Sequence, residues 1–579
     1  MKKKIAHYSG QDITCFESLN LHPILARVYS HRNIHQVSQL DNSLSNLLLY
    51  HHLLNIEEAV AVIYQAIQAQ EKILIIGDYD ADGATSTALM MRVLRAFGAR
   101  NISYLVPNRF DFGYGLTPTL VESIGKDKPD LIITVDNGIA SHEGVELANS
   151  FGINVVITDH HISPDELPKA AAIVNPNQKN DLFESKNLAG VGVAFYLLMA
   201  LRAKLRAEHW FEKNNIEEPN LANHLDLVAL GTVADIVTLD HNNRILVQQG
   251  LARIRSEKCC EGIRALIDIS NRKLSSITAA DLGFAIGPRL NAAGRLEDMS
   301  IGIECLLADD KVCARELAET LNRLNQERRV IENSMQLEAV SILEKIKFKQ
   351  DQKLPTGVCL FNESWHQGVI GILASRVKDS INRPVIAFAV DSDNQNYLKG
   401  SARSVSGLPM CDVLSNISMN HPEIIIKFGG HAMAAGLTIA KNHFKTFLKV
   451  FDDEVKQILK QPLTEEIMLS DGKLTPEDFT LTLAEQIKFA GPWGEGFPEP
   501  LFDGEFVVVD QRLLGQKHLK LTLDLGSHLI DAIAFNIDPN EWPNFRYNKV
   551  RLAFSLDINE YRERKQLQLL AHYLEGIQE

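Results

Sequence analysis

Three aspartates at alternate positions, Asp78, Asp80 and Asp82, are the residues of this 579-residue chain best suited to carry chemistry. They follow the short apolar run 73–76, which is typical of a buried strand, and they precede a helix expected from about Thr85. Crowding like charges is costly unless a cation lies among them, and hard divalent cations prefer oxygen ligands. The stretch therefore indicates a metal site, with a solvated Asp-rich turn as the alternative.

Two later apolar runs end in residues of the same kind. The run 131–135 leads into Asp-Asn-Gly at 136–138, and the run 155–158 leads into Asp-His-His at 159–161. Ligands of open α/β folds bind at the carboxyl-terminal edge of the sheet, where such loops converge. A neutral imidazole beside carboxylates suits Mn²⁺ as well as Mg²⁺. With so many acids at one edge, two metal ions are expected.

A fourth acidic position, Asp235, lies within the apolar segment Gly-Thr-Val-Ala-Asp-Ile-Val at 231–237. A carboxylate in such a setting is expensive to bury without a partner. Asp235 is therefore either a metal ligand or a structural hydrogen-bond acceptor, and we favour the ligand.

Repeated strand and helix patterns must position these side chains. Residues 1–70 read as helices, and from Ile73 the pattern alternates between strands and helices, which favours a parallel sheet. Its strands are expected at 73–76, 102–106, 131–135, 155–158 and 173–174. We divide the chain into an N-terminal helical segment (1–70), a parallel-sheet domain (71–305), a long connecting helix (306–350), a smaller α/β domain (351–460) and a C-terminal β-barrel (461–579).

The bulk composition sets limits on the function. A formal net charge of −14 argues against a general electrostatic nucleic-acid binder, although a local basic channel stays open. The seven cysteines are scattered, which indicates a reducing compartment without a disulfide framework. We find neither a secretory signal nor an apolar run of about 18 residues. The expectation is a cytoplasmic protein with no membrane association.

The order of these motifs resembles a known family, the DHH phosphoesterases. The segments at 78–83, 136–138, 159–161 and 231–237 look like motifs I to IV of that family. Gly-Ser-Ala-Arg-Ser at 400–404 and Phe-Gly-Gly-His-Ala-Met-Ala-Ala-Gly at 428–436 look like the DHHA1 domain that accompanies them. The resemblance covers nearly the whole chain and is closest to the members that degrade single-stranded DNA. It implies an OB-fold for the C-terminal barrel.

The resemblance also assigns roles to residues. Two ions, Mn²⁺ or Mg²⁺, would be held by Asp80, Asp82, Asp136, His160 and Asp235, with Asp78 and His161 as direct ligands or close neighbours. Asp136 would bridge the ions, and Asp159 would orient a histidine. The catalytic group would comprise Asp136, His160, His161 and His431.

Further residues are candidates for gripping a DNA end. In the loop 106–115, Arg109 could hold a terminal phosphate and Tyr114 could stack a base, or Tyr114 could simply pack. The glycine-rich segment 283–295 is read as part of a strand channel, or else as a structural turn. The candidates in that segment are Arg289, Asn291 and Arg295. By resemblance, Arg109, Ser401 and Arg403 belong to a 5′-phosphate pocket. The Gly-Gly-His sequence at 429–431, with Gly430 and His431, would lie near the active cleft, where His431 could contact the scissile phosphate or could equally be structural. In the barrel, Lys517, His518 and Lys520 could follow a single strand.

The implied function is a single-stranded-DNA-specific 5′-to-3′ exonuclease that releases 5′ mononucleotides by two-metal hydrolysis in DNA repair and recombination. One alternative is a phosphodiesterase of short oligonucleotides or dinucleotides, and another is a scaffold that binds single strands without turnover. Expected partners are single-stranded DNA, a single-strand-binding protein and a helicase, with the chain acting as a monomer.

Overall fold

A five-stranded parallel sheet carries the residues singled out in the sequence. Its strands are β2 (Ile73–Ile76), β3 (Ile102–Leu105), β4 (Leu131–Val135), β5 (Asn154–Thr158) and β6 (Ala172–Val174). Their order is β3-β2-β4-β5-β6. Ile76 pairs with Thr134, and Val135 pairs with Thr158, so β2, β4 and β5 end side by side. The segments that follow them therefore start at one edge of the sheet.

The computed structural model describes residues 3–9, 13–17, 19, 21–107, 115–124, 128–349, 354–459, 466–515, 517–539, 541–561 and 564–577. These fall into two compact units. The larger comprises Lys3–Gly294, Met299–Leu321 and Ile467–Glu579, and the smaller comprises mainly Arg295–Asp298 and Asn322–Glu466. None of the helices in the described ranges has the length and apolar character needed to cross a membrane.

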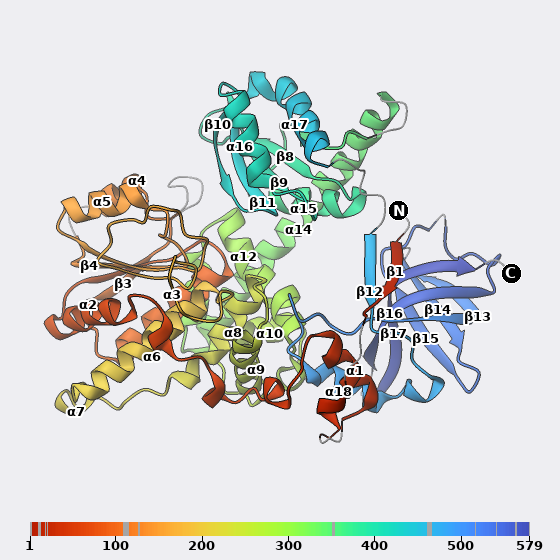
Figure 1. The fold of residues 1–579 in the computed structure, drawn as a ribbon, viewed down its shortest axis with the longest axis horizontal. Coiled ribbons are helices and arrows are strands. Elements are labelled where there is room, and N and C mark those ends of the chain that lie inside the picture. The colour runs from red at the N-terminus through yellow and green to blue at the C-terminus, as the bar shows by residue number, and fades with distance from the viewer. Residues whose placement is uncertain are drawn as a thin grey trace. The chain divides into compact units, whose positions relative to one another are not determined.

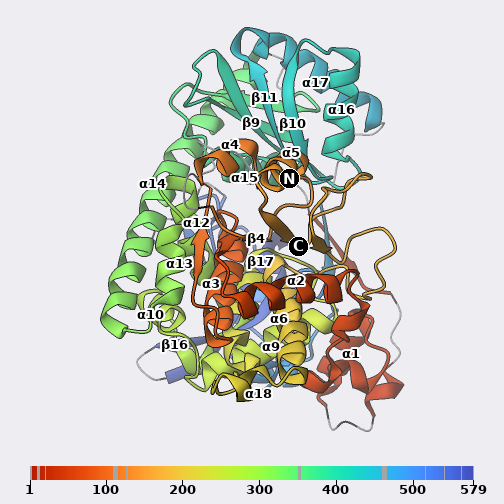
Figure 2. The same cartoon turned by 90° about the vertical axis from the view of Figure 1, so that its left-hand side faces the viewer.

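Helices cover both faces of the parallel sheet (Figure 1). Alternate strand residues such as Leu74, Ile132 and Val155 pack in one core with α4 (Pro118–Ser123) and α5 (His142–Ser150). The opposite face is covered by three helices, which Figure 2 shows from the side: α2 (Ile56–Ala69), α3 (Ala81–Ala96) and α6 (Gly190–Ala207). The strands β2, β4, β5 and β6 are almost entirely buried, as a sheet covered on both faces requires, whereas the edge strand β3 is partly exposed.

The rest of the larger unit before the long helix is helical. Its α-helices are α1 (Pro23–His31), α7 (Trp210–Lys213), α8 (Leu225–Ala234), α9 (His241–Arg255), α10 (Glu261–Ile269), α11 (Ala279–Asp281), α12 (Gly287–Leu296) and α13 (Ser300–Leu307). Short 3₁₀ turns lie at 14–16, 37–40, 44–46, 50–52, 221–224 and 274–276.

Two readings of the sequence are corrected here. The segment 283–295 is not a structural turn, because a π-helix at Leu282–Ile286 continues directly into α12. Its place in a strand channel stays a prediction. Residues 3–7 are not helical. They form strand β1 (Lys3–His7), which pairs with β12 (Glu466–Ser470) near the C-terminal barrel.

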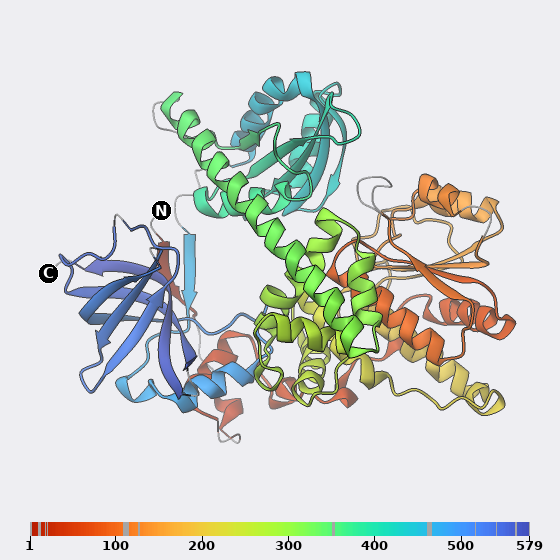
Figure 3. The ribbon, with the colours of Figure 1, turned by 180° about the vertical axis from the view of Figure 1, so that it is seen from behind.

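The long helix is α14 (Lys311–Lys349), which Figure 3 shows as one continuous green helix. Beyond it lies a mixed sheet of order β10-β11-β9-β8-β7. Its elements are β7 (Val358–Phe361), α15 (Ile370–Ile381), β8 (Val385–Val390), β9 (Tyr397–Arg403), α16 (Met410–Asn420), β10 (Ile425–Gly430), β11 (Ala434–Ala440), a 3₁₀ turn (Lys441–His443) and α17 (Phe444–Ile458).

A closed barrel of five strands ends the chain, after a 3₁₀ turn (Pro476–Asp478) and α18 (Leu481–Ala490). Its strands are β13 (Phe502–Leu514), β14 (His518–Asp524), β15 (Leu529–Ala534), β16 (Lys549–Tyr561) and β17 (Arg564–Ile577). The predicted architecture of parallel sheet, long helix, second α/β sheet and barrel is thus confirmed.

Candidate metal centre and nucleic-acid contacts

The loop that carries the first three aspartates is shaped by its own side chains. Oδ1 of Asp80 accepts hydrogen bonds from the backbone N–H groups of Asp82 and Gly83, at 2.9 and 3.0 Å, and so caps α3. This capping explains why the helix begins at Ala81, four positions before the expected Thr85. A Cβ on Gly83 would lie 2.5 Å from the carbonyl oxygen of Asp78. Only glycine therefore lets the helix start this close to Asp78, whose side chain is buried.

Asp82 is held by the first turn of α6. Its two carboxylate oxygens accept hydrogen bonds from the backbone N–H groups of Gly190 (2.6 Å) and Val191 (2.9 Å). The N-terminus of a helix offers unpaired N–H groups and a favourable dipole to an anion. The Gly-Val-Gly sequence at 190–192, which on sequence alone suggests only a tight turn, is therefore part of the site. A glycine pair that opens an apolar helix was the available signal.

Asp136 occupies a strained position at the centre of this edge. Its φ is +62°, an uncommon value for a residue other than glycine. Its side chain is only 2% exposed, and a Cβ on Gly190 would lie 2.5 Å from the Cβ of Asp136. The start of α6 therefore touches Asp136 as well as Asp82. Strain held in place by such packing is common where a side chain must be aimed.

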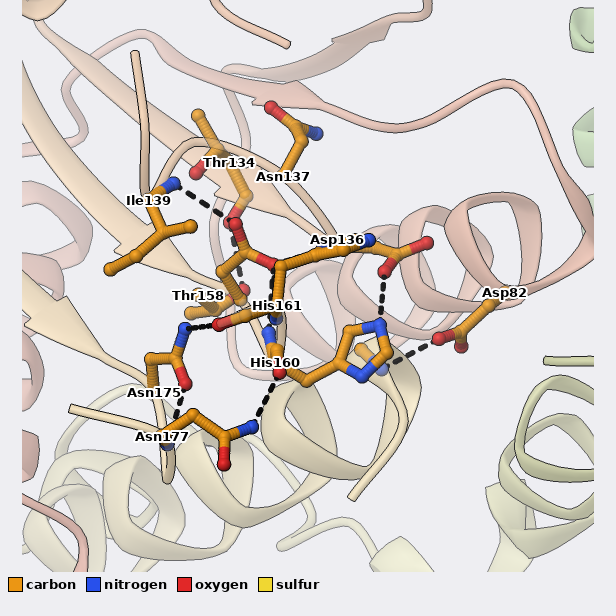
Figure 4. A network of polar contacts seen from close by, with 12 residues as sticks. Asp82, Thr134, Asp136, Asn137, Ile139, Thr158, His160, His161, Asn175 and Asn177 are labelled. Carbon is orange, nitrogen blue, oxygen red and sulfur yellow. Dashed lines mark hydrogen bonds and ion pairs between the residues drawn. The ribbon is translucent and has the colours of Figure 1, made fainter. Parts of the chain in front are cut away.

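The Asp-His-His triplet follows β5 and is shown in Figure 4. Nε2 of His160 lies 3.1 Å from Oδ1 of Asp136 and 3.5 Å from Oδ2 of Asp235. Nδ1 of His161 donates to Oδ1 of the buried Asp159 at 2.7 Å, and Oδ2 of Asp159 accepts from the N–H of Ile139 at 2.9 Å. Asp159 thus orients His161 and fixes which ring nitrogen faces the centre.

Two asparagines that sequence reasoning missed support the same turn (Figure 4). The side-chain amide of Asn175 donates to the carbonyl of His161 at 2.9 Å, and that of Asn177 donates to the carbonyl of His160 at 2.6 Å. Both follow β6, in the sequence Asn-Pro-Asn at 175–177. Both residues stand just after a parallel strand, which is the same signal that identified Asp78, Asp136 and Asp159.

Potential ligand atoms gather in three groups, each with its atoms within 4.8 Å of one another. The groups are Asp136 with His160 and His161, Asp82 with His160 and Asp235, and Asp78 with Asp80 and Asp136. The structure therefore brings all seven predicted metal-binding residues to one centre, and Asp136 belongs to two of the groups.

Electrostatics make this centre unfavourable without a cation. Burial, followed by the charge of Asp80, raises the pKa of Asp82 to about 7. Burial and then the neighbouring carboxylates also raise the pKa of Asp136 and of Asp235 well above the usual range. Burial would lower the pKa of His161, but the hydrogen bond to Asp159 outweighs it and raises that pKa to about 9.

The donor set fits divalent metal ions. Carboxylate oxygens and imidazole nitrogens are ligands that Mn²⁺ accepts, and Mg²⁺ accepts the oxygens. A cation at the centre would remove the repulsion that raises the carboxyl pKa values.

Comparison with known proteins decides the family. The DHH family N-terminal domain matches residues 72–232, the DHHA1 domain matches 354–457 and the RecJ OB domain matches 470–573. The single-stranded-DNA-specific exonuclease RecJ of Dickeya dadantii (strain 3937) is 51% identical over 557 residues, which cover 96% of each chain. The chain belongs to the RecJ family.

Solved RecJ structures agree with this assignment. RecJ from Thermus thermophilus in complex with Mn²⁺ superposes with a TM-score of 0.80 at 28% identity, covering 100% of this chain and 80% of that chain. The complex of the same protein with Mg²⁺ gives a TM-score of 0.75 at 27% identity, covering 100% and 78%.

The residues predicted to contact DNA lie at several separate places in the chain, whereas the metal-binding residues are gathered in one group. Arg109 and Tyr114 lie outside the described residues. Oδ1 of Asn291 accepts a hydrogen bond from the N–H of Ala81 at 2.8 Å, so this side chain holds the aspartate loop. The sequence did not reveal this role. Arg289, two residues earlier on α12, donates through Nη1 to the carbonyl of Ala285.

In the smaller unit, Ser401 and Arg403 lie together on β9. Nη1 of Arg403 donates to Oγ of Ser401 at 3.2 Å. A Cβ on Gly371, in the first turn of α15, would lie 3.0 Å from both side chains. A serine, an arginine and a helix N-terminus form a cradle suited to a phosphate.

The remaining predicted residues of this unit lie on the same sheet or beside α12. Gly430 has φ +144°, and its Cβ would lie 2.5 Å from the carbonyl oxygen of Ala434. The N–H of the exposed His431 donates to that carbonyl at 2.7 Å. Nη1 of Arg295 donates to the carbonyl of Gly368 at 3.3 Å. Gly430 therefore shapes the turn that presents His431.

On the barrel, Lys520 pairs with Asp531 at 2.5 Å and His518 contacts the ring of Phe535, with 4.9 Å between ring centroids. Lys517 is exposed in the turn directly before the strand β14, which carries His518 and Lys520.

Proposed function

We propose that this chain is a 5′-to-3′ exonuclease that hydrolyses single-stranded DNA with two divalent ions and releases 5′ mononucleotides. The observation that carries the proposal is the position of Asp136, which shares ligand groups with His160 and His161 on one side and with Asp78 and Asp80 on the other. A carboxylate placed between two groups suits a bridging ligand in a two-metal site.

The chemistry would be divided between the ions and the chain. Bound ions of this kind lower the pKa of a water molecule and neutralise charge on a phosphodiester. The chain holds the ligands rigidly: α6 orients Asp82, Asp159 orients His161, and Asn291 fixes the aspartate loop. Such support keeps ligands at the geometry that hydrolysis needs.

Polarity is proposed to come from a 5′-phosphate pocket. Ser401 and Arg403 offer a hydroxyl and a guanidinium beside the N-terminus of α15. A guanidinium bonds two phosphate oxygens at once and so favours a terminal phosphate over a hydroxyl. Arg109, Arg289, Arg295 and His431 are proposed to contribute further contacts to the same strand.

Action on short oligonucleotides is the second candidate. A closed barrel that carries His518 and Lys520 on β14, with Lys517 directly before them, favours a long single strand as substrate, because a dinucleotide needs no additional track.

The test is digestion of strands labelled at either end, with Mn²⁺, Mg²⁺ or EDTA. We expect metal-dependent release of mononucleotides from the 5′ end, and no release by Asp136→Ala. Asp268→Ala, which removes an exposed carboxylate on α10, is the matched control and should keep full activity. Unchanged activity in Asp136→Ala, or release from the 3′ end, would refute the proposal.

The biological setting is also proposed. We place the chain in the cytoplasm, acting as a monomer in DNA repair and recombination on strands supplied by a helicase and a single-strand-binding protein. Family membership supports this setting.

A further inference from the structure

The loop that follows Asp235 has an unusual backbone. Asp235 ends α8, and the next residue, Ile236, has φ +59° while its side chain is 69% exposed. A β-branched residue in this left-handed region is a conformational outlier. An exposed side chain gains no packing that could offset the strain. Contacts of the neighbouring residues must therefore hold this backbone in place.

Those contacts come from a turn that lies about 260 residues later in the chain, Gly494–Phe497. The N–H of Leu239 donates to the carbonyl of Glu495 at 2.8 Å. A Cβ on Gly494 would lie 2.7 Å from Cδ1 of Leu239, and a Cβ on Gly496 would lie 2.4 Å from Cγ2 of Thr238. The two glycines let the turn approach the Asp235 loop to contact distance.

The turn is itself fixed on its far side. Gly494 and Phe497 exchange two backbone hydrogen bonds, at 2.9 and 3.1 Å. The Phe497 ring is buried between Trp493, at 5.1 Å between centroids, and the Arg244 guanidinium, at 4.4 Å. Nε1 of Trp493 donates to the carbonyl of Ile487 in α18 at 2.8 Å. The turn is thus a rigid support rather than a loose connection.

We infer that the Gly494–Phe497 turn positions the metal ligand Asp235. The segment that leads from α18 into the barrel would then influence metal affinity in addition to connecting these two elements. The inference rests on the proposed function, because it takes Asp235 as a ligand. The turn touches no reacting group. It acts through Thr238 and Leu239, which fix the loop between Asp235 and α9.

Gly496→Ala in the full chain is the test. Gly496 has φ +69°, and the new methyl group would meet Thr238. We expect the Mn²⁺ dissociation constant, measured by electron paramagnetic resonance of free Mn²⁺ without DNA, to rise roughly tenfold, as for other residues that orient metal ligands. Affinity for a single-stranded oligonucleotide in EDTA should not change.

Two comparisons separate positioning from general damage. Gly526→Ala places alanine at an equally left-handed residue, φ +84°, with no atom within 4 Å of its Cβ, and should bind Mn²⁺ like the parent chain. Adding Thr238→Ser to Gly496→Ala removes Cγ2, after which the nearest remaining Thr238 atom is Cβ at 3.4 Å. This double variant should recover most of the lost affinity.

Several results would overturn the inference. A folded Gly496→Ala chain with parental Mn²⁺ affinity would do so, as would equal weakening by Gly526→Ala. If Gly496→Ala does not fold, Gly494→Ala takes its place, and parental affinity in that variant is equally decisive. Failure of the parent chain itself to bind Mn²⁺ would instead refute the proposed function.

Discussion

Removal of metal ions should make the folded chain less stable as the pH rises from 5 to 8. Asp82 and Asp136 are almost fully buried, and both have a pKa raised above the unfolded value. Folding therefore favours their protonated forms. Their stabilising contribution is complete below the unfolded pKa, near 4, and is lost as the pH passes the folded pKa, about 7 for Asp82.

Other groups at the centre do not reverse this sign. Burial opposes the charged form of His161, but the hydrogen bond to Asp159 raises its pKa to about 9. Its contribution also declines with rising pH, between its unfolded value and 9. For Asp159, burial is outweighed by the bond from His161, so its pKa is lowered. Its contribution is lost only in acid, below the pH range considered.

The magnitude follows from Asp82 alone. Its pKa of about 7 stands about three units above the reference value of 3.8, and roughly two of those units lie above pH 5. At 1.36 kcal/mol per unit, this carboxyl should cost roughly 3 kcal/mol of unfolding free energy between pH 5 and 8. For a domain of about 200 residues, that corresponds to a fall of roughly 6–10 °C in the melting temperature.

The assay is thermal unfolding in EDTA at several pH values, followed by circular dichroism. Mn²⁺ at pH 8 should restore the lost stability, because it binds only the folded centre. Asp136→Asn removes one of the buried carboxyls and should therefore reduce the pH dependence, whereas Asp268→Asn, on the exposed face of α10, should not. A metal-free pH dependence of the melting temperature that is the same in Asp136→Asn as in the parent chain would refute the reasoning.

Further substitutions test the residues that support the metal centre and the proposed 5′-phosphate pocket. Asn291→Ala, which frees the N–H of Ala81, should weaken Mn²⁺ binding roughly tenfold by calorimetry, while Asn291→Asp should not. If Asn291→Ala loses only DNA affinity, the residue is instead a strand contact. Gly190→Ala, with its Cβ 2.5 Å from that of Asp136, should abolish nucleotide release, and Gly152→Ala, with open space around it, should leave the rate unchanged. Arg403→Ala should reduce the ratio of degradation rates for 5′-phosphorylated and 5′-hydroxyl strands, without a change in Mn²⁺ affinity.

The parallel sheet and the gathering of acids and histidines at one of its edges could be predicted from the sequence, because both depend on local pattern. Apolar β-branched runs mark strands, and polar residues directly after them must meet at one edge. The five predicted strands agree with the observed ones to within one residue at each end. The acids and histidines that follow β2, β4 and β5 lie together for the same reason.

The supporting contacts could not be predicted in this way, because they join segments far apart in the chain. The glycine pair at 190–192 signals a close approach but does not identify Asp82 as the partner, and no local pattern identifies Asn291 as the partner of Ala81. The strand β15 (Leu529–Ala534) has only a weak local signal, because apolar Leu529 and Ile533 stand on its outward positions and obscure the alternation. The structural turn considered for segment 283–295 is wrong because its glycines belong to helices. A Cβ on Gly294 would lie 1.9 Å from the carbonyl oxygen of Tyr79, so this glycine lets α12 approach the aspartate loop closely.

The contacts between the segment that follows β1 and the segment that follows β12 have a consequence for how the chain folds during synthesis. Arg32 forms two hydrogen bonds to the buried Asp471, at 2.8 and 2.9 Å, and His31 donates to the same carboxylate across a separation of 440 residues. During synthesis, the segment around Arg32 must therefore wait for Asp471, which is made 439 residues later, before its buried polar groups are paired. Until then its apolar residues stay open to other partners, so this part of the fold should form late.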